Sequence, residues 1–233
     1  MKVGIMQPYF FPYIGYWQLI KNVDKYVIYD DVNFIKGGWI NRNNILVNGN
    51  AKLINLQINK VSSNKLINEI EIVRNDVSNK KLLKTIKESY CKAPYFENVF
   101  PLVENIINQD EKNLAKYLVF LTKEVCKYIK IDTEIIVSSD IKKNNALRGQ
   151  DKVLEICKLL SADQYINSIG GQNLYSTSEF ISQGIELKFL KNNDISYLQF
   201  SKNQFVPNLS IIDVMMFNSN ERVQEILCEY RTL

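Results

Sequence analysis

The chain has 233 residues, of which 46% are hydrophobic and 23% are charged, and its formal net charge is +4. These values are close to the average for soluble globular proteins, and a chain of this size can bury a full core. The charge lacks the strong asymmetry of a nucleic-acid-binding protein, so no nucleic-acid partner is expected. No apolar run approaches the roughly 20 residues of a membrane-spanning helix, and no signal sequence precedes the first strand, so we expect no membrane span and a cytoplasmic location.

Histidine is absent from the sequence. This absence excludes Ser-His-Asp and Cys-His catalysis as well as histidine-ligated metals. Any proton transfer must therefore use Asp, Glu, Lys, Tyr, Cys or the substrate itself. The cysteines, Cys91, Cys126, Cys157 and Cys228, are far apart and form no Cys-x-x-Cys pair, so no metal site is predicted.

The N-terminal segments alternate between strand and helix patterns. Residues 3–6 predict a short buried strand, residues 13–21 have helical periodicity, and residues 25–29 predict a second strand. A strand, a helix and a strand in this order imply a parallel sheet with a right-handed crossover.

The middle of the chain predicts a β-hairpin followed by helices, inserted around residues 44–130. Asn48-Gly49 is a strong hairpin-turn signal because both residues tolerate positive φ. The last helix of the insertion is long and apolar, so we expect it to pack against the sheet. The expected segments are strands over 44–47 and 51–58, a short strand over 70–73, and helices over 77–90, 96–107 and 112–129.

The C-terminal part returns to alternating strands and helices. The expected segments are strands over 133–138, 164–167 and 185–190 and helices over 150–160, 178–183, 210–218 and 221–230. No linker rich in Gly, Pro or Ser divides the chain, so residues 1–233 are expected to form a single α/β domain with a mostly parallel, Rossmann-like sheet. Exposed terminal helices would permit a homodimer.

The first polar and aromatic cluster, Gln7 to Trp17, follows the first predicted strand. Ligands of open α/β sheets bind at the carboxyl ends of the strands, and a helix N-terminus there offers free N–H groups to a phosphate. Gly15 would let the helix start approach a ligand closely. The alternative is an aromatic plug that packs the top of the sheet. The candidate ligand contacts are Gln7, Tyr9, Phe10, Tyr13 and Gly15.

The second cluster, Tyr29 to Asn43, follows the second strand and so shares an edge with the first. Adjacent carboxylates such as Asp30 and Asp31 repel each other unless they are solvated or share a cation. Lys36 and Arg42 could supply that cation, and both also suit a pyrophosphate. The alternative is a surface loop in which the Asp side chains cap turns.

Two weaker clusters follow. Gly170-Gly171 comes after a strand but lacks a phosphate-loop pattern, so a simple turn is the better interpretation. Ser210 and Asp213 fit an S-x-x-D capping pattern, which explains both residues without catalysis. Paired lysines such as Lys142-Lys143 are interpreted as solvated faces.

Together these clusters resemble the WbqC-like family of bacterial surface-polysaccharide gene clusters. The matching segments are VGIMQPYFFPYIGYWQLI, YDDVNFIKGGWINRN, LLSADQYINSIGGQNLY and FVPNLSIIDVMMFN. The first strand and loop are also similar to nucleotidyltransferase and pantothenate-synthetase-like folds. Those folds carry His-x-Gly-His at the position where this sequence has Pro12 to Tyr16, so activation of a substrate by ATP is less favoured.

The resemblance implies a transferase that N-acylates or N-aminoacylates a dTDP- or UDP-linked amino sugar in O-antigen biosynthesis. Asp31 or Asp30 would act as base, while Asn41 or Asn43 would hold the oxyanion. The substrate contacts would be a pyrophosphate on Lys36 and Arg42 and a ring stacked on Tyr9, Phe10 or Trp39, beside Gly170 and Gly171.

No cofactor follows firmly from the residues. The acyl donor would be a thioester of coenzyme A or of a carrier protein, which would then be a partner. Two alternatives stay open: an ATP-dependent amino acid–sugar ligase, and a non-catalytic subunit that binds a sugar nucleotide or glycan.

Overall fold

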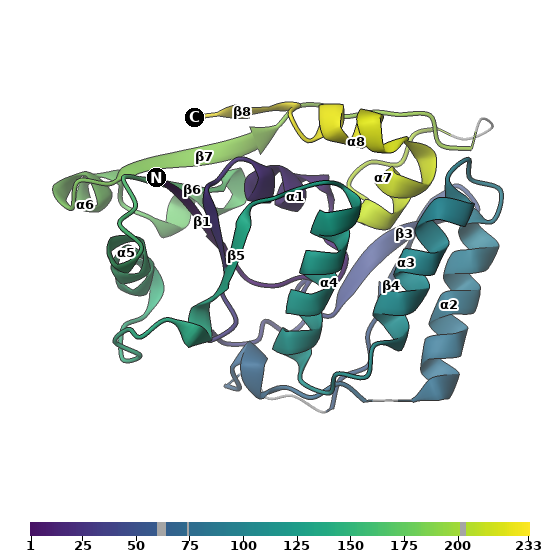
Figure 1. Cartoon of the computed structure of the whole chain (residues 1–233), viewed down its shortest axis with the longest axis horizontal. Coiled ribbons are helices and arrows are strands. Elements are labelled where there is room, and N and C mark those ends of the chain that lie inside the picture. The colour runs from purple at the N-terminus through teal and green to yellow at the C-terminus, as the bar shows by residue number, and fades with distance from the viewer. Residues whose placement is uncertain (60–63, 74, 201–203) are drawn as a thin grey trace.

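The computed structural model describes residues 1–59, 64–73, 75–200 and 204–233. A six-stranded sheet with the order β5-β2-β1-β6-β7-β8 forms its centre (Figure 1). The strands are β1 (Lys2–Met6), β2 (Lys25–Ile28), β5 (Glu134–Val137), β6 (Gln164–Ser168), β7 (Glu186–Asn192) and β8 (Tyr230–Thr232). All neighbouring strands are parallel except β7 and β8. The expected α/β fold with a mostly parallel, Rossmann-like sheet is therefore confirmed.

Helices cover both faces of this sheet. Tyr26 and Ile28 of β2 belong to the core that contains α1 (Ile14–Lys21), whereas Val27 belongs to the core with α5 (Gly149–Leu159) and α6 (Thr177–Ser182). Successive side chains of a strand point to opposite faces, so strands covered on both sides must be apolar throughout. This arrangement explains the continuous apolar runs in the sequence.

The chain adds strands first on one side of β1 and then on the other, so the direction in which the sheet grows reverses beside β1. From β1 the chain runs through α1 to β2 and later to β5, and α5 then leads back to β6 on the other side of β1. In an open α/β sheet the crevice at such a reversal, at the carboxyl ends of the strands, is where ligands bind. In this chain the reversal lies between β1 and β6.

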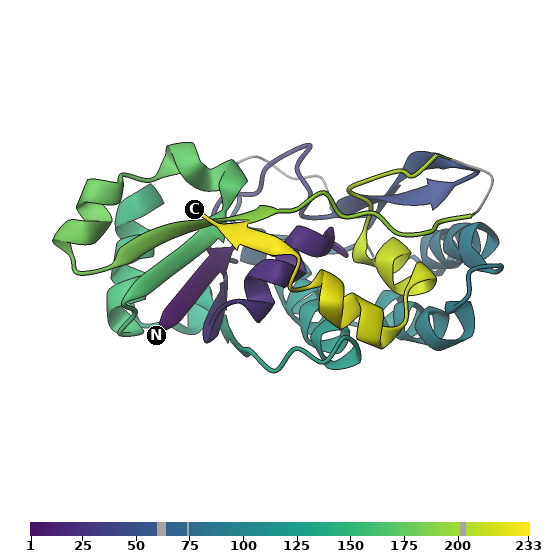
Figure 2. The same cartoon turned by 90° about the horizontal axis from the view of Figure 1, so that it is seen from above.

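The segment between β2 and β5 holds a hairpin and a group of helices, which extend to one side of the sheet (Figures 1 and 2). The hairpin joins β3 (Arg42–Val47) to β4 (Asn50–Asn55), and its turn has φ values of 50° at Asn48 and 77° at Gly49, as predicted. The helices of this segment are α2 (Asp76–Tyr90), α3 (Phe96–Asn108) and α4 (Leu114–Tyr128). α3 contacts both α2 and α4, and α4 is the helix of this group that lies nearest the sheet (Figure 1).

Two expected segments differ from the structure. The helix predicted over 221–230 ends early: α8 spans Asn220–Ile226, and Tyr230–Thr232 forms strand β8 on the edge of β7. An edge strand offers unpaired backbone groups, and pairing with them outweighs local helical periodicity. Within residues 70–73, Glu71 and Ile72 form isolated bridges in place of the expected strand.

The terminal helices are also less exposed than expected. Every residue of α7 (Ile211–Phe217) is buried, so the expectation of exposed terminal helices is wrong for α7. Within the described residues, no helix combines the length and the apolar character needed to cross a bilayer.

Candidate functional site

A cavity of about 680 Å³ opens at the reversal of the sheet, and we refer to it as the switch-point cavity. Its walls come from the carboxyl ends of β1, β2 and β6, from the first turns of α1 and α5, and from the loop that contains Ile35 and Trp39. Ligand sites of small molecules have volumes of roughly 300–1,000 Å³. The cavity therefore has the place and the size of a ligand site in a Rossmann-like fold.

Many of the residues that the sequence suggested as ligand contacts do line this cavity. They come from the loop after β1, from the loop after β2 and from the turn after β6. These residues are Gln7, Tyr9, Tyr13, Gly15, Trp39, Gly170 and Gly171. Segments that are far apart in the sequence thus meet at one edge of the sheet.

Two helix N-termini face the cavity. Gly15 of α1 and Gly149 of α5 both line it, and the N-cap residues Tyr13 and Arg148 supply no capping hydrogen bond from their side chains. The first turn of a helix has N–H groups without intrahelical partners, and the helix dipole makes this end attractive to anions. The cavity can therefore hold a phosphate without a charged side chain.

Gly15 is required for this arrangement. A Cβ atom at Gly15 would lie 2.5 Å from Nδ2 of Asn192 and 2.6 Å from Cε2 of Tyr13. Only glycine allows Tyr13 and Asn192 to approach the first turn of α1 so closely.

Tyr29, at the end of β2, is a candidate contact that the sequence did not single out as a ligand-binding residue. Its ring lines the cavity, and its buried hydroxyl has no hydrogen-bond partner among the described residues. Burial, and then the negative charge of Asp31, raise the pKa of Tyr29, so the phenol stays protonated. A buried polar group without a partner is costly, and a bound ligand can satisfy it. The sequence feature that points to Tyr29 is its position at the end of the strand predicted over 25–29, where the second cluster begins.

The wall formed by β6 is held in place by a hydrogen-bond network. Nδ2 of Asn167 donates to the hydroxyl groups of Tyr165 at 2.8 Å and Tyr175 at 3.1 Å, and its Oδ1 accepts from the backbone of Ser168 at 2.6 Å. Gly171 lies against this amide, since a Cβ there would be 3.3 Å from Cγ of Asn167. Asn167, Ser168 and Tyr175 line the cavity, so hydrogen bonds within the protein hold this side of the site in place.

Charged side chains are absent from the described residues that line the switch-point cavity. Its polar surface consists of amides, hydroxyls and backbone groups, between aromatic rings. A cation next to the lining is Lys152, whose Nζ lies 5.3 Å from the centroid of the Tyr29 ring. Favourable interactions with an anion would thus come from helix ends and from charge outside the cavity.

Asp31 is the centre of a buried charged cluster beside the cavity. Its carboxylate lies 2.8 Å from Nζ of Lys143 and 2.9 Å from Nζ of Lys152, and the hydroxyl of Ser138 donates to it at 2.7 Å. The side chains of both lysines are almost fully buried, with exposures of 1% and 3%. Burial alone would raise the pKa of Asp31, but the hydrogen bonds from Lys143, Ser138 and Lys152 outweigh it and lower the pKa.

Asp30 lies next to this cluster and is held by other groups. It accepts hydrogen bonds from the backbone of Ser139 at 2.9 Å and from the hydroxyl of Ser139 at 2.7 Å, and burial raises its pKa. Neither Asp30 nor Asp31 lines the switch-point cavity. Their assignment as catalytic bases stays a prediction, and it would require the buried cluster to open.

Lys36 and Arg42 are not the cations that neutralise the Asp pair, so this prediction is wrong. Lys143 and Lys152 take that role, and Lys143 is correspondingly not part of a solvated face. These lysines lie far along the chain, and the parallel pairing of β2 with β5 brings their segment to the carboxyl end of β2. Only the paired sheet creates this neighbourhood.

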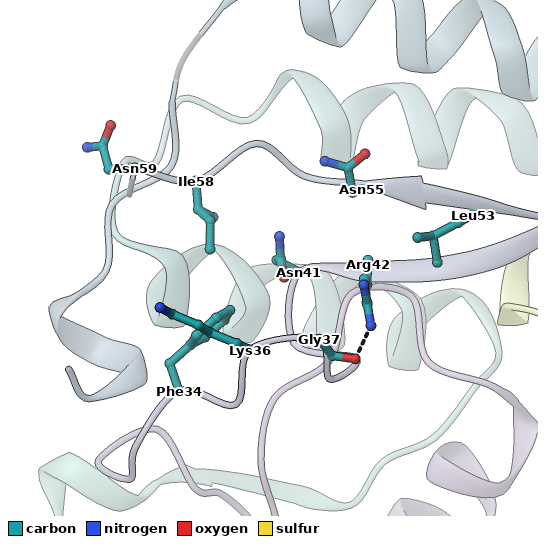
Figure 3. Close-up of a pocket in the computed structure, with 9 residues that line it drawn as sticks. All are labelled: Phe34, Lys36, Gly37, Asn41, Arg42, Leu53, Asn55, Ile58 and Asn59. Carbon is teal, nitrogen blue, oxygen red and sulfur yellow. Dashed lines mark hydrogen bonds between the residues drawn. The ribbon is translucent and has the colours of Figure 1, made fainter. Parts of the chain in front are cut away.

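Lys36, Asn41 and Arg42 instead line a separate groove of about 320 Å³, the outer groove, beside the β3–β4 hairpin (Figure 3). The guanidinium of Arg42 donates from Nε to the carbonyl of Gly38 at 2.9 Å and from its Nη2 to the carbonyl of Gly37. Nδ2 of Asn41 donates to the carbonyl of Leu56 at 3.0 Å. The structure therefore does not bring these residues together with Gln7, Tyr13 and Gly15.

Phe10 and Asn43 build the cavity without being part of its lining. Phe10 is fully buried and packs edge-on against Phe11, with 4.9 Å between the ring centroids, as the aromatic-plug alternative predicts. Nδ2 of Asn43 donates to the carbonyls of Phe10 at 3.2 Å and Phe11 at 2.8 Å. The two residues fix the loop that follows β1.

Asp213 has a different role from the predicted helix cap. Ser210 does cap α7, since its Oγ accepts from the backbone of Ile212 at 3.2 Å. The fully buried carboxylate of Asp213 instead accepts from the hydroxyls of Tyr90 and Tyr197, at 2.8 and 2.7 Å, and from the amide of Gln199 at 2.8 Å. A capping pattern is local, whereas this network joins α2, α7 and the segment before α7.

The chain is similar to known proteins over nearly its whole length. The model of the WbqC-like protein family matches residues 7–225, a range that includes every described residue lining the switch-point cavity except Ile5 and Met6. The chain is 24% identical to the Uncharacterized protein Rv1507c of Mycobacterium tuberculosis over 228 residues, which cover 97% of each chain. No solved structure matches the chain.

Proposed function

The chain belongs to the WbqC-like protein family, and we propose that it transfers an acyl or aminoacyl group to the amine of a nucleotide-linked amino sugar. The observation that carries this proposal is the switch-point cavity. It combines the ligand position of a Rossmann-like sheet, two uncapped helix N-termini and a buried phenol without a partner, Tyr29.

The helix N-termini support a ligand that carries phosphate. A nucleoside diphosphate placed against Gly15 would receive hydrogen bonds from the first turn of α1 and would lie along the helix dipole. The first turn of α5, at Gly149 and Gln150, offers a second such position across the cavity. Lys36 and Arg42 have no part in this binding mode.

The remaining lining suits a nucleobase and a sugar. Tyr9, Tyr13 and Trp39 present aromatic faces on which a planar base or the apolar face of a sugar ring can pack. Gln7 and Ser168 add neutral groups that can donate or accept hydrogen bonds with sugar hydroxyls.

The chemistry needs few groups from the protein. A neutral amine attacks a thioester readily, so positioning of the two reactants and stabilisation of the oxyanion supply most of the rate increase. The protonated phenol of Tyr29 is suited to donate a hydrogen bond to the bound sugar nucleotide and so to hold it in position. In this mechanism the proton lost by the amine leaves with the thiol product, and neither Asp30 nor Asp31 is required.

A second candidate is a non-catalytic subunit that binds a sugar nucleotide. The observation that favours it is that the described lining of the cavity contains no carboxylate and no thiol. Binding without turnover would be expected of such a protein. The same cavity would serve both functions.

The experiment that tests the proposal measures the binding of UDP-glucosamine and of a dTDP-linked 4-amino-4,6-dideoxyhexose by thermal shift and calorimetry. A ligand at a hundredfold excess over its Kd stabilises the folded state by about 2.7 kcal/mol. Tyr29→Phe should not lower the melting temperature of the free protein, because the hydroxyl makes no hydrogen bond to described residues and its burial without a partner is unfavourable. The affinity should fall about three- to tenfold, as expected for one lost hydrogen bond.

Turnover with a short acyl thioester is then followed by mass spectrometry of the sugar nucleotide. An N-acylated product supports the transferase. Saturable binding without product supports the binding subunit. If neither sugar nucleotide binds, or if Tyr29→Phe leaves both affinities unchanged, the proposed placement of the ligand is wrong.

A further inference from the structure

A second, smaller cavity of about 300 Å³ adjoins the switch-point cavity, and we refer to it as the side compartment. Its walls are Tyr9, Pro12, Tyr13, Trp39, Asn43 and Asn208. Tyr9, Tyr13 and Trp39 also line the switch-point cavity, so the two spaces meet across these rings. A group held in one space lies next to a group held in the other.

The side compartment is held in shape by hydrogen bonds between distant segments. The carbonyl of Phe11 accepts from Nδ2 of Asn43 and from the hydroxyl of Ser210, both at 2.8 Å. The backbone of Ser210 donates to the carbonyl of Asn44 at 2.8 Å. The loop after β1, strand β3 and the start of α7 are thereby fixed to one another, so the compartment does not need a ligand to form.

The polar groups of the side compartment are all neutral. Burial raises the pKa values of Tyr9 and Tyr13, so both hydroxyls stay protonated. Asn208 has a φ of 57°, and no hydrogen bond of its carboxamide is found among the described residues. The lining thus consists of aromatic rings, a proline, phenols and carboxamides, which suits an uncharged occupant with a carbonyl or amide group.

We infer that the side compartment binds the acyl end of a thioester donor, beside an amino sugar in the switch-point cavity. This inference rests on the proposed function. The volume fits a short acyl group and the amide-containing arm that bears its sulfur, and the free carboxamide of Asn208 pairs with such an amide. The nucleotide part of the acceptor stays on the helix N-termini, which lie in the switch-point cavity.

The reaction then takes place across the shared rings. The amine nitrogen of the sugar attacks the thioester carbonyl, a C–N bond forms and the C–S bond breaks. The electron pair of the C–S bond leaves with sulfur, which takes up the proton lost by the amine. The products are an N-acylated sugar nucleotide and a free thiol, and no oxidant or reductant is consumed.

Trp39 provides a direct readout of the compartment. Its side chain is 46% exposed and forms part of the shared wall, whereas the other tryptophan, Trp17, is fully buried. The probe is S-acetyl-N-acetylcysteamine, an uncharged thioester with an amide and without phosphate. We expect a saturable change in tryptophan fluorescence that disappears in Trp39→Phe.

Asn208→Gly tests the proposed contact between the carboxamide of Asn208 and the amide of the probe. Glycine tolerates the positive φ at this position, and the substitution removes the carboxamide. The Kd of the probe should rise about three- to tenfold, as for one lost hydrogen bond. The matched control is Asn55→Ala, which removes a carboxamide from the outer groove and should leave this Kd unchanged (Figure 3). Saturating UDP-glucosamine should not displace the probe.

Three results would overturn the inference: no saturable signal up to the solubility of the probe, an unchanged Kd in Asn208→Gly, or competition between the probe and the sugar nucleotide. The proposed function fails in a different way. If the probe binds with the expected dependence on Asn208 but no sugar nucleotide binds, the compartment is a thioester site and the acceptor is misidentified.

Discussion

The buried charged cluster around Asp31 and the switch-point cavity lie side by side at the carboxyl edge of the sheet, yet they differ in how their polar groups are satisfied. In the cluster, Asp31 is shared by Lys143, Lys152 and Ser138 at 2.7–2.9 Å. In the cavity no described lining side chain is charged, but the hydroxyl of Tyr29 and the first turns of α1 and α5 have no side-chain partners.

This difference shows that a cluster of charged side chains does not by itself indicate a ligand-binding site. A carboxylate that already accepts several hydrogen bonds has little capacity left for a ligand, and exposing it would leave buried lysines unpaired. Neutral groups without partners gain the most from a ligand. The cluster is therefore expected to support stability and the cavity to support binding.

The largest expected effect is on stability, through Asp31→Asn. Removing the charge leaves two buried lysines without a counter-ion, and breaking a buried pair in this way costs about 3–5 kcal/mol. Urea denaturation measures the loss, with Asp140→Asn as the control, because Asp140 is exposed on the same segment and its replacement should change stability by less than about 0.5 kcal/mol. Equal stability of the two variants would contradict the structural role of the cluster.

The contribution of Asp31 to the free energy of unfolding should also depend on pH. Its pKa is lower in the folded protein than in the unfolded chain, where the carboxyl titrates near 4, so its stabilisation is complete above that value. It is lost as the pH falls through the lower folded pKa. The stability difference between the wild type and Asp31→Asn, measured from pH 3 to 7, should therefore be constant near neutrality and shrink on the acid side. A difference that grows with acidity would mean that the folded pKa is raised.

Gly15→Ala should have a smaller effect, mainly on binding. The new Cβ would meet Tyr13 and Asn192 at 2.6 and 2.5 Å, so the ring of Tyr13 must move within the cavity. We expect the affinity for a sugar nucleotide to fall about tenfold, equal to roughly 1.4 kcal/mol. Gly170→Ala is the control, because its new Cβ would have no neighbour closer than 3.9 Å. Equal affinities of the two variants would place the ligand away from α1.

The smallest effect is expected for Lys36→Ala. Its side chain lines the outer groove and not the switch-point cavity, so the affinity for a sugar nucleotide should change by less than about twofold (Figure 3). Calorimetry at low and high salt measures this affinity, since a lysine–phosphate contact would weaken with salt. A tenfold loss that salt abolishes would move the phosphate site to the outer groove, as the sequence first suggested.

Much of the fold could be predicted from the sequence because the signals are local. The turn at Asn48-Gly49 and the alternation of strands and helices depend on residues close together in the chain. The loop from Gln7 to Gly15 was also placed correctly, since the carboxyl edge of a parallel sheet follows from the order of the elements. Gly170 and Gly171 are expected at the same edge, because they too follow a parallel strand.

The partners of charged residues could not be predicted in this way. Proximity in the sequence favours Lys36 and Arg42 as partners of Asp31, whereas Lys143 and Lys152 are its neighbours in space. Asp213 fitted a cap but accepts hydrogen bonds from Tyr90 and Tyr197. The sequence does not reveal the role of Tyr29, because an unpartnered hydroxyl is recognisable only once its surroundings are known.

The sequence by itself thus determined the class of fold and the edge of the sheet at which ligands would bind, since hydrophobic periodicity and turn chemistry act between neighbours in the chain. The tertiary structure alone decided which polar groups are paired and which are free. Pairing depends on distance and burial in three dimensions. A carboxylate that is paired with a buried cation stabilises the fold and is not free to act as a catalytic base.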